Sequence, residues 1–397
     1  YFILKEIWED HPFFQTLPKT LAFDRQITEP LSIKKNSNIS PANKKIRIAA
    51  IDIEEYANIS HQITDKDNLT YLKEYFEIVL IPEKKFRSSI IDFFNFLTTK
   101  NISFVFLNTT IDPWQLFKYR NDHQLPIGFI FWPYIFKPWK KRYFRLAQYA
   151  RAIDTFLVFS NYLKKSLRQI SLNFSVLDFP VPIDITKFDL STQKSQQLIL
   201  AYCGRLNPNK NIHILLALLG SLKNKLDFKF NIICPLTNLA KHENDYLSLL
   251  KNIIKNFNIE NNVTFHGDLS DDQTKRNTII KNSNVLVFIS TDHGETFGRA
   301  IIEGMAGGCA IITSNWQAVR ELVSDGKNGF VIDIKNGLPD TKQLLSSILL
   351  LSEPKTRKAI GKINLQKAKK YDYRLHLPKL TDTLAQKQLA TETITEP

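Results

Sequence analysis

Residues 285–314, VLVFISTDHGETFGRAIIEGMAGGCAIITS, decide the fold of this 397-residue chain. The apolar, β-branched run 285–289 predicts a buried strand that ends in a polar loop. The paired glycines Gly307 and Gly308 predict the end of a helix, and the run 310–313 predicts a second strand. A strand, a helix and a strand in such close succession form a βαβ unit, in which the two strands run parallel.

The loop and helix of this unit carry two carboxylates, Glu295 and Glu303, with seven residues between them. A helix that begins near Phe297 or Gly298 directs its unpaired N–H groups beyond the strand end, which favours a phosphate there. One carboxylate can then accept hydrogen bonds from the hydroxyls of a sugar and the other from those of a ribose. The alternative is a helix capped by Thr296, with Glu303 on a solvated face.

A second strand-to-helix turn carries two cations. The run 198–203 leads into Gly204 and Arg205, and Lys210 precedes an amphipathic helix. Together the cations could neutralise a diphosphate, each charge-assisted contact contributing roughly 1.5 to 3 kcal/mol. The alternative is a pair of surface cations at the start of a helix.

These motifs resemble those of the retaining glycosyltransferases of family 4, also called glycosyltransferases group 1. Glu295 and Glu303 match the E-x7-E signature of that family, and Gly204-Arg205 to Lys210 match its GR-x-x-x-x-K element. The resemblance is firm over residues 198–335 and loose over 155–190. It implies catalytic roles for Arg205, Lys210 and Glu295, and donor-binding roles for Gly204, Gly267, Gly294, Thr296, Phe297, Gly298 and Glu303.

Two series of strand-like runs predict the architecture. The first series is 46–53, 76–82, 102–108, 127–133, 155–160 and 174–180, and the second is 198–204, 228–235, 263–267, 285–289, 310–314 and 329–333. Helical stretches separate most of these runs, which predicts α/β domains with parallel sheets covered on both faces. The resemblance implies the GT-B fold, in which two Rossmann-like domains face each other across a cleft.

Four regions are expected along the chain. They are an N-terminal extension and linker (1–45), a Rossmann-like acceptor domain (46–190), a Rossmann-like nucleotide-sugar donor domain (191–370), and a C-terminal helix that crosses back to the first domain, with a tail (371–397). The helices expected in the acceptor domain are 68–77, 88–100, 139–153 and 161–170.

The first half departs from the family pattern. Gly128 is the only glycine before residue 200, so the glycine-rich loop that the family places after its first strand is missing. Trp132 or Tyr134 stands where many members carry a histidine near the reacting sugar. In the second half, residues 315–317 replace a glycine pair and predict a bulkier cleft wall. These departures leave the activity of the acceptor domain open.

The resemblance implies a retaining, metal-independent hexosyltransferase that moves a sugar from a nucleotide-diphosphate donor to a hydroxyl of a glycan, a lipid-linked molecule or a small molecule. UDP and GDP are the expected donor nucleotides, and no resident cofactor is expected. One alternative is a catalytically weakened sugar-nucleotide-binding protein of the same fold. A sugar-nucleotide epimerase or NAD enzyme is a weaker alternative, because no G-x-G-x-x-G motif follows a predicted strand.

A net charge of +14 indicates acidic partners. Six cations lie from Lys137 to Arg151, interleaved with aromatic residues and without an acidic residue before Asp154, which predicts peripheral contact with an anionic membrane surface. The alternative is a solvated basic helix face. Nucleic acid is not an expected partner, because no recognised reading module accompanies these residues.

The cysteine pattern and the apolar runs indicate a cytoplasmic protein, with peripheral membrane contact at the inner face. The three cysteines lie in or beside apolar runs without metal-ligand spacing, which predicts buried thiols in a reduced compartment. The longest apolar run, 127–136, is too short to cross a bilayer, and no secretory signal opens the chain. Because the sequence starts at Tyr1, we expect the natural N-terminus upstream.

Overall fold

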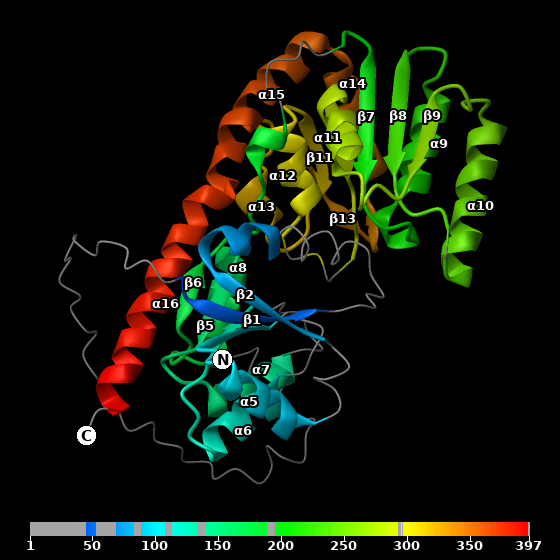
Figure 1. Ribbon diagram of the computed structural model, residues 1–397. Helices are drawn as coiled ribbons and strands as arrows, with labels where there is room; N and C mark the ends of the chain where they lie inside the picture. The colour runs from blue at the N-terminus through cyan, green and yellow to red at the C-terminus, as the bar shows by residue number, and fades with distance from the viewer. Residues whose placement is uncertain are drawn as a thin grey trace, which may run out of the picture. The chain divides into compact units, whose positions relative to one another are not determined.

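The computed structural model describes residues 45–52, 69–82, 89–107, 113–132, 140–188, 195–237, 239–292, 295 and 297–395. These residues form two six-stranded sheets in which every recorded strand pair is parallel (Figure 1). The predicted α/β class with two Rossmann-like sheets is therefore confirmed. A small antiparallel pair, β13 (Ile334–Lys335) with β14 (Leu338–Pro339), was not predicted.

The first sheet has the strand order β2-β1-β3-β4-β5-β6. Its strands are β1 (Arg47–Asp52), β2 (Glu77–Pro82), β3 (Phe104–Leu107), β4 (Gly128–Phe131), β5 (Thr155–Val158) and β6 (Val176–Asp178), and its helices include α5 (Ile90–Thr99), α6 (Trp114–Asp122), α7 (Lys140–Tyr149) and α8 (Asn161–Ile170). Residues 69–75, within the expected helix 68–77, are helical as well. The order changes direction between β1 and β3, which is where ligands of such sheets bind. The segments that follow these two strands, 53–68 and 108–112, lie outside the described residues.

The second sheet has the order β12-β11-β10-β7-β8-β9. Its strands are β7 (Leu198–Cys203), β8 (Phe228–Ile233), β9 (Val263–Gly267), β10 (Val285–Phe288), β11 (Ala310–Ser314) and β12 (Gly329–Ile332). Numbered within the sheet, this is the Rossmann order 3-2-1-4-5-6 read from one edge. Its direction changes between β7 and β10, so the carboxyl ends of these two strands mark the predicted ligand crevice. The helices of this half are α9 (Ile212–Ser221), α10 (Lys241–Asn256), α11 (Gln273–Asn282), α12 (Arg299–Ala306), α13 (Val319–Leu322), α14 (Thr341–Ser352), α15 (Pro354–Ala368) and α16 (Tyr373–Thr395).

Strand β10 is buried on both faces. Val285 and Val287 pack into one apolar core, which also contains residues of α9, α10 and α14. Leu286 and Phe288 belong to the other core, together with residues of α12. Burial on both faces explains why this strand is a continuous apolar run rather than an alternating one.

Helix α12 begins and ends at glycines. Its N-cap is Gly298, with φ of 76°, and its C-cap is Gly307, followed by Gly308 with φ of 70°. A Cβ atom at Gly298 would lie 2.9 Å from Trp316, so both the backbone angle and the space require glycine there. The predicted helix start and end are confirmed, and the N-cap residue, a glycine, makes no side-chain cap hydrogen bond.

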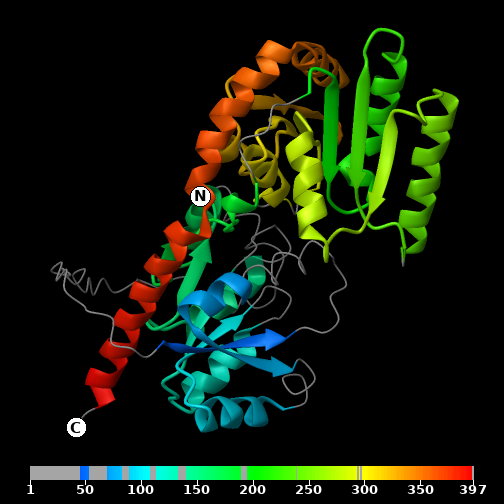
Figure 2. The ribbon, with the colours of Figure 1, turned by 45° about the horizontal axis from the view of Figure 1, so that its top comes forward.

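Helix α16 lies beside the first sheet and contacts the helical residues 69–75 and the residues just before β5 and β6 (Figures 1 and 2). The Tyr373 ring stacks on Tyr71 at 4.2 Å, and its hydroxyl donates to Glu74 at 3.0 Å. Further along, the Lys387 ammonium donates to the Asp154 carbonyl oxygen and, at 2.8 Å, to Ser175 Oγ. No helix within the described residues is long and apolar enough to cross a membrane.

Candidate active site

The loops that follow β7 and β10 meet at Lys210. This residue ends a short 3-10 helix (Pro208–Lys210), and only 3% of its surface is exposed. Its ammonium forms an ion pair with Glu295 and donates to Ser290 Oγ at 3.1 Å. The structure therefore brings together two residues predicted from motifs 85 positions apart.

Asn211 joins these two loops. Its backbone has φ of 55°, and its side-chain amide donates to the Ile289 carbonyl oxygen at 2.8 Å and to Thr291 Oγ1 at 3.2 Å. The Thr291 N–H donates in turn to the Asn209 carbonyl oxygen at 2.8 Å. Sequence reasoning missed Asn211, although an asparagine at a turn is among the residues that tolerate this backbone angle.

Each predicted phosphate cation has a carboxylate partner. Arg205, whose side chain is 36% exposed, lies 3.6 Å from Asp292, and Lys210 lies 3.9 Å from the same carboxylate group. Asp292 was not among the predicted site residues. With Glu295 beside Lys210, the two cations face two anions, so an arriving diphosphate would have to displace carboxylate contacts.

Glu303 is buried rather than solvated. Only 3% of its surface is exposed, and Oε1 accepts hydrogen bonds from Arg276 Nη2 at 2.8 Å and from Arg299 Nε at 2.9 Å. The alternative in which Glu303 lies on a solvated helix face is therefore wrong. Cys203, at the end of β7, is near enough for these charges to act on it, although burial is the main cause that raises the pKa of its thiol to about 12.

The predicted site glycines that the structure describes lie at strand ends and at a helix start. Gly267 ends β9 with φ of 77°, and a Cβ atom there would meet no atom within 4 Å. Gly204 follows β7, where a Cβ atom would lie 2.8 Å from the hydroxyl of Tyr202. That hydroxyl donates to the Arg205 carbonyl oxygen at 2.6 Å. Gly294 and Thr296 lie outside the described residues.

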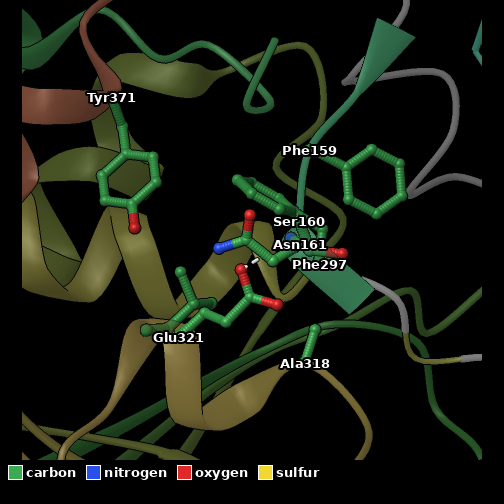
Figure 3. A pocket seen from close by; sticks show the side chains of 8 residues that line it. Phe159, Ser160, Asn161, Phe297, Ala318, Glu321 and Tyr371 are labelled. Carbon is green, nitrogen blue, oxygen red and sulfur yellow. Dashed lines mark hydrogen bonds between the residues drawn. The ribbon is translucent and has the colours of Figure 1, made fainter. Parts of the chain in front are cut away.

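Phe297 lines a cavity of about 320 Å³ beside the motif loop (Figure 3). Its ring packs edge-on against Phe159, with centroids 5.3 Å apart, and against Tyr371 at 6.1 Å. The remaining lining residues are Ser160, Asn161, Ala318, Glu321 and Leu322. This cavity thus joins the motif loop to the beginning of α8 and to the segment before α16.

The Glu321 side chain caps the amino end of α8. Its two carboxylate oxygens accept hydrogen bonds from the N–H groups of Asn161, at 2.8 Å, and Tyr162, at 3.0 Å. Figure 3 shows the carboxylate directly beside Asn161. Ser160 Oγ accepts from the Leu163 N–H at 3.1 Å, so local and distant side chains together satisfy three amides of the first turn.

The residues expected to replace the family histidine are only partly described. Trp132 is buried, with its ring edge-on to Phe106 and Phe179. Tyr134 lies outside the described residues. Trp316, expected to form a bulkier cleft wall, is buried against Gly298 and donates from Nε1 to Thr313 Oγ1 at 3.2 Å.

The basic segment from Lys137 to Arg151 is also only partly described. Lys137 and the side chains of residues 140–142 lie outside the described parts. Arg145 lies over the Trp114 ring at 5.9 Å. Arg151 donates to the Leu125 carbonyl oxygen at 3.1 Å, and burial lowers the pKa of its guanidinium. Arg151 is therefore held by its own domain, which leaves five cations for the predicted membrane contact.

Comparison with known proteins finds a family match in the second half of the chain. Residues 184–367 match the family model of glycosyl transferases group 1. The match covers somewhat less than half of the chain, and over this segment the chain is similar to the group 1 glycosyltransferases. The segment contains β7, β10 and α12, with the paired cations and carboxylates at their ends.

Solved glycosyltransferase structures share the fold over most of the chain. A glycosyltransferase from Rickettsia africae aligns with a TM-score of 0.66 and 16% identity, covering 86% of this chain and 98% of that one. The Anabaena protein HepE in complex with UDP-glucose aligns with a TM-score of 0.63 and 14% identity, covering 86% of this chain and all of that one. The predicted GT-B fold is confirmed.

Two curated relatives match over about half of this chain. Poly(glycerol-phosphate) alpha-glucosyltransferase of Bacillus subtilis is 26% identical over 195 residues, 48% of this chain and 26% of that protein. The capsular polysaccharide biosynthesis glycosyltransferase CapM of Staphylococcus aureus is 27% identical over 191 residues, 45% of this chain and 46% of that protein. The match thus spans less than half the length of either relative.

Proposed function

We propose that this protein is a group 1 glycosyltransferase, and specifically a retaining, metal-independent enzyme that transfers a hexose from a nucleoside-diphosphate sugar to an acceptor hydroxyl. The observation that carries the proposal is the meeting of Arg205, Lys210 and Glu295 at the switch point between β7 and β10. Ligands of doubly wound sheets bind at this place. The adjacent amino end of α12, at Gly298, adds a positive helix end for a phosphate.

In the proposed reaction the bond between the anomeric carbon and the diphosphate oxygen breaks, and the acceptor oxygen bonds to that carbon. The acceptor proton leaves with the diphosphate. Arg205, Lys210 and the first amides of α12 would stabilise the charge that develops on the leaving diphosphate, which is electrostatic catalysis. Glu295 would hold Lys210 and accept hydrogen bonds from the donor sugar.

UDP is the donor nucleotide we propose to test first. HepE, which shares the fold, has been solved with UDP-glucose. The names of the curated relatives refer to poly(glycerol phosphate) and to capsular polysaccharide, so we propose a cell-surface polymer or its lipid-linked precursor as the acceptor.

The test is titration calorimetry of the full chain with UDP, GDP and ADP, followed by an assay for slow hydrolysis of the matching sugar nucleotide. Arg205→Ala should weaken binding by roughly tenfold or more, because it removes a charge-assisted phosphate contact. Arg47→Ala is a matched control, since Arg47 has the same 36% side-chain exposure and pairs with Glu77 in the first sheet. Absence of binding to all three nucleotides, or equal effects of the two variants, would contradict the proposal.

A second candidate function is donor binding without transfer. The first half lacks a glycine-rich loop, and Trp132 is buried in an aromatic cluster at the place of the family histidine. A turnover assay distinguishes the two functions: a binding protein would hold UDP but release no sugar from UDP-glucose, even with excess acceptor.

Peripheral membrane contact through Lys137 to Arg151 stays a prediction from the sequence. Sedimentation with phosphatidylglycerol vesicles at low salt tests it, because surface charge attraction is screened by salt. A variant with Lys140, Lys141 and Arg142 all changed to alanine should remain in the supernatant, and equal pelleting of both proteins would refute the prediction.

A further inference from the structure

Glu303 receives both of its recorded hydrogen bonds on one oxygen. Arg276 Nη2 and Arg299 Nε both donate to Oε1, at 2.8 Å and 2.9 Å. Oε2 of the same carboxylate accepts no hydrogen bond from the residues that the structure describes. A carboxylate can accept several hydrogen bonds, so this arrangement leaves one oxygen for a ligand.

The two arginines constrain Glu303 differently. Arg299 lies four residues before Glu303 on α12, so it moves together with that helix. Arg276 comes from α11, and its side chain is only 4% exposed. Its contact therefore holds the Glu303 carboxylate in place relative to a second helix, and a planar guanidinium is well suited to this.

The phosphate cations and Glu303 contact different elements. Lys210 and Arg205 meet the loop that follows β10, through Ser290 and Asp292. Glu303, in contrast, contacts Arg276 of α11 and Arg299 of its own helix. Because Glu295 pairs with Lys210 at the phosphate site, Glu303 is the carboxylate of the motif that is left for the ribose hydroxyls of a nucleoside diphosphate.

We propose that Arg276 is a positioning residue, which occupies Oε1 of Glu303 and turns Oε2 toward the ribose hydroxyls of a bound nucleoside diphosphate. Preference for a ribonucleotide then depends on a residue that does not touch the nucleotide. The inference rests on the proposed function of the Arg205 and Lys210 site.

The experiment compares UDP with 2′,3′-dideoxy-UDP, which lacks both ribose hydroxyls, by titration calorimetry. The wild-type protein should bind UDP at least about tenfold more tightly, the size of one lost hydroxyl-to-carboxylate hydrogen bond. Arg276→Met should reduce this ratio to within about threefold and change the affinity for dideoxy-UDP by less than about threefold. Arg276→Lys should give an intermediate ratio, because one ammonium holds a carboxylate less firmly than a guanidinium does.

Arg357→Met is the matched control. Arg357 is equally buried, at 3% exposed, and donates to the carbonyl oxygens of Leu351, Ser352 and Gln196 in the same half of the chain. It should lower the melting temperature and leave the ratio unchanged. A purely structural role of Arg276 would give the same pattern as this control.

The outcomes separate the two proposals. If wild type binds neither UDP, GDP nor ADP, the proposed function fails and the inference fails with it. If wild type binds UDP but does not distinguish dideoxy-UDP, or if Arg276→Met keeps the wild-type ratio, only the inference is overturned. Should Arg276→Met not fold, the ratio of Arg276→Lys decides, and a wild-type value overturns the inference.

Discussion

Asp292 lies where a phosphate oxygen would be expected, between Arg205 and Lys210. Its carboxylate is 3.6 Å and 3.9 Å from the two cations. Bound phosphate and this carboxylate would compete for the same positive charge. The protein therefore supplies its own negative charges to both cations.

We expect Asp292→Asn to strengthen UDP binding by about threefold to tenfold, because the competing negative charge is removed. Titration calorimetry at low and moderate salt measures this change. Asp245→Asn, an exposed acid on α10, controls for the general gain in positive charge. Weaker binding by Asp292→Asn than by wild type would show that Asp292 instead takes part in holding the donor.

Asp154 is the fully buried partner of Arg120. Its carboxylate accepts from Arg120 at 2.5 Å and 3.0 Å, from the Phe129 N–H at 2.9 Å and from the Arg151 N–H at 2.7 Å. Asp154→Asn should lower the free energy of unfolding by about 3 to 5 kcal/mol, because it leaves the buried guanidinium without a counter-charge. Chemical denaturation measures this, and a loss below about 1 kcal/mol would contradict the expected burial of charge.

Among the elements, α8 depends on a cap from 160 residues away, the carboxylate of Glu321. Glu321→Ala and Ser160→Ala should each lower the free energy of unfolding by about 1 kcal/mol, since each removes acceptors from the first turn. Only the Glu321 effect should shrink in high salt, because only Glu321 adds a charge at the helix end. Urea denaturation with and without added salt tests this, and equal salt dependence of the two variants would refute it.

The strands of the two six-stranded sheets were predictable from the sequence, whereas the partners of the buried charges were not. Each predicted apolar run contains an observed strand, and the signal is clearest in strands such as β10, whose residues are all buried and therefore form a continuous apolar segment. Helix α6 was missed because one of its inward residues is Arg120, which no apolar period counts as core. Likewise, the motif spacing pointed to Glu303, but Arg276 lies on another helix, and only packing brings it within 2.8 Å.

At the scale of the whole molecule, the buried Lys387 of α16 makes the free energy of unfolding depend on pH. Burial lowers the pKa of its ammonium to about 8, from 10.5 for an ordinary lysine. Between these values the unfolded chain binds more protons than the folded one, so this group makes stability rise with pH. Below pH 8 both states carry the charge, and the folded state bears the whole desolvation penalty.

We therefore expect the unfolding free energy of wild type, relative to Lys387→Met, to increase by about 2 kcal/mol between pH 7.5 and pH 10. Taking the difference between the two proteins cancels the titration of the other groups. Urea denaturation across this pH range measures it. If the difference in unfolding free energy between the two proteins does not change with pH, the Lys387 ammonium is hydrated in the folded protein.

The contacts of α16 also set an order of events during protein synthesis. Lys387 follows its partner Asp154 by 233 residues, and Tyr373 follows Glu74 by 299. When the first sheet leaves the ribosome, the helix that packs on it has not yet been made. Protease treatment of ribosome-bound chains should cleave the first sheet faster before residue 373 emerges than after residue 395. The first half of the chain is thus synthesised first but gains its last stabilising contacts only when α16 has been made. The second half, with the candidate nucleotide site, must be synthesised before the first half reaches full stability.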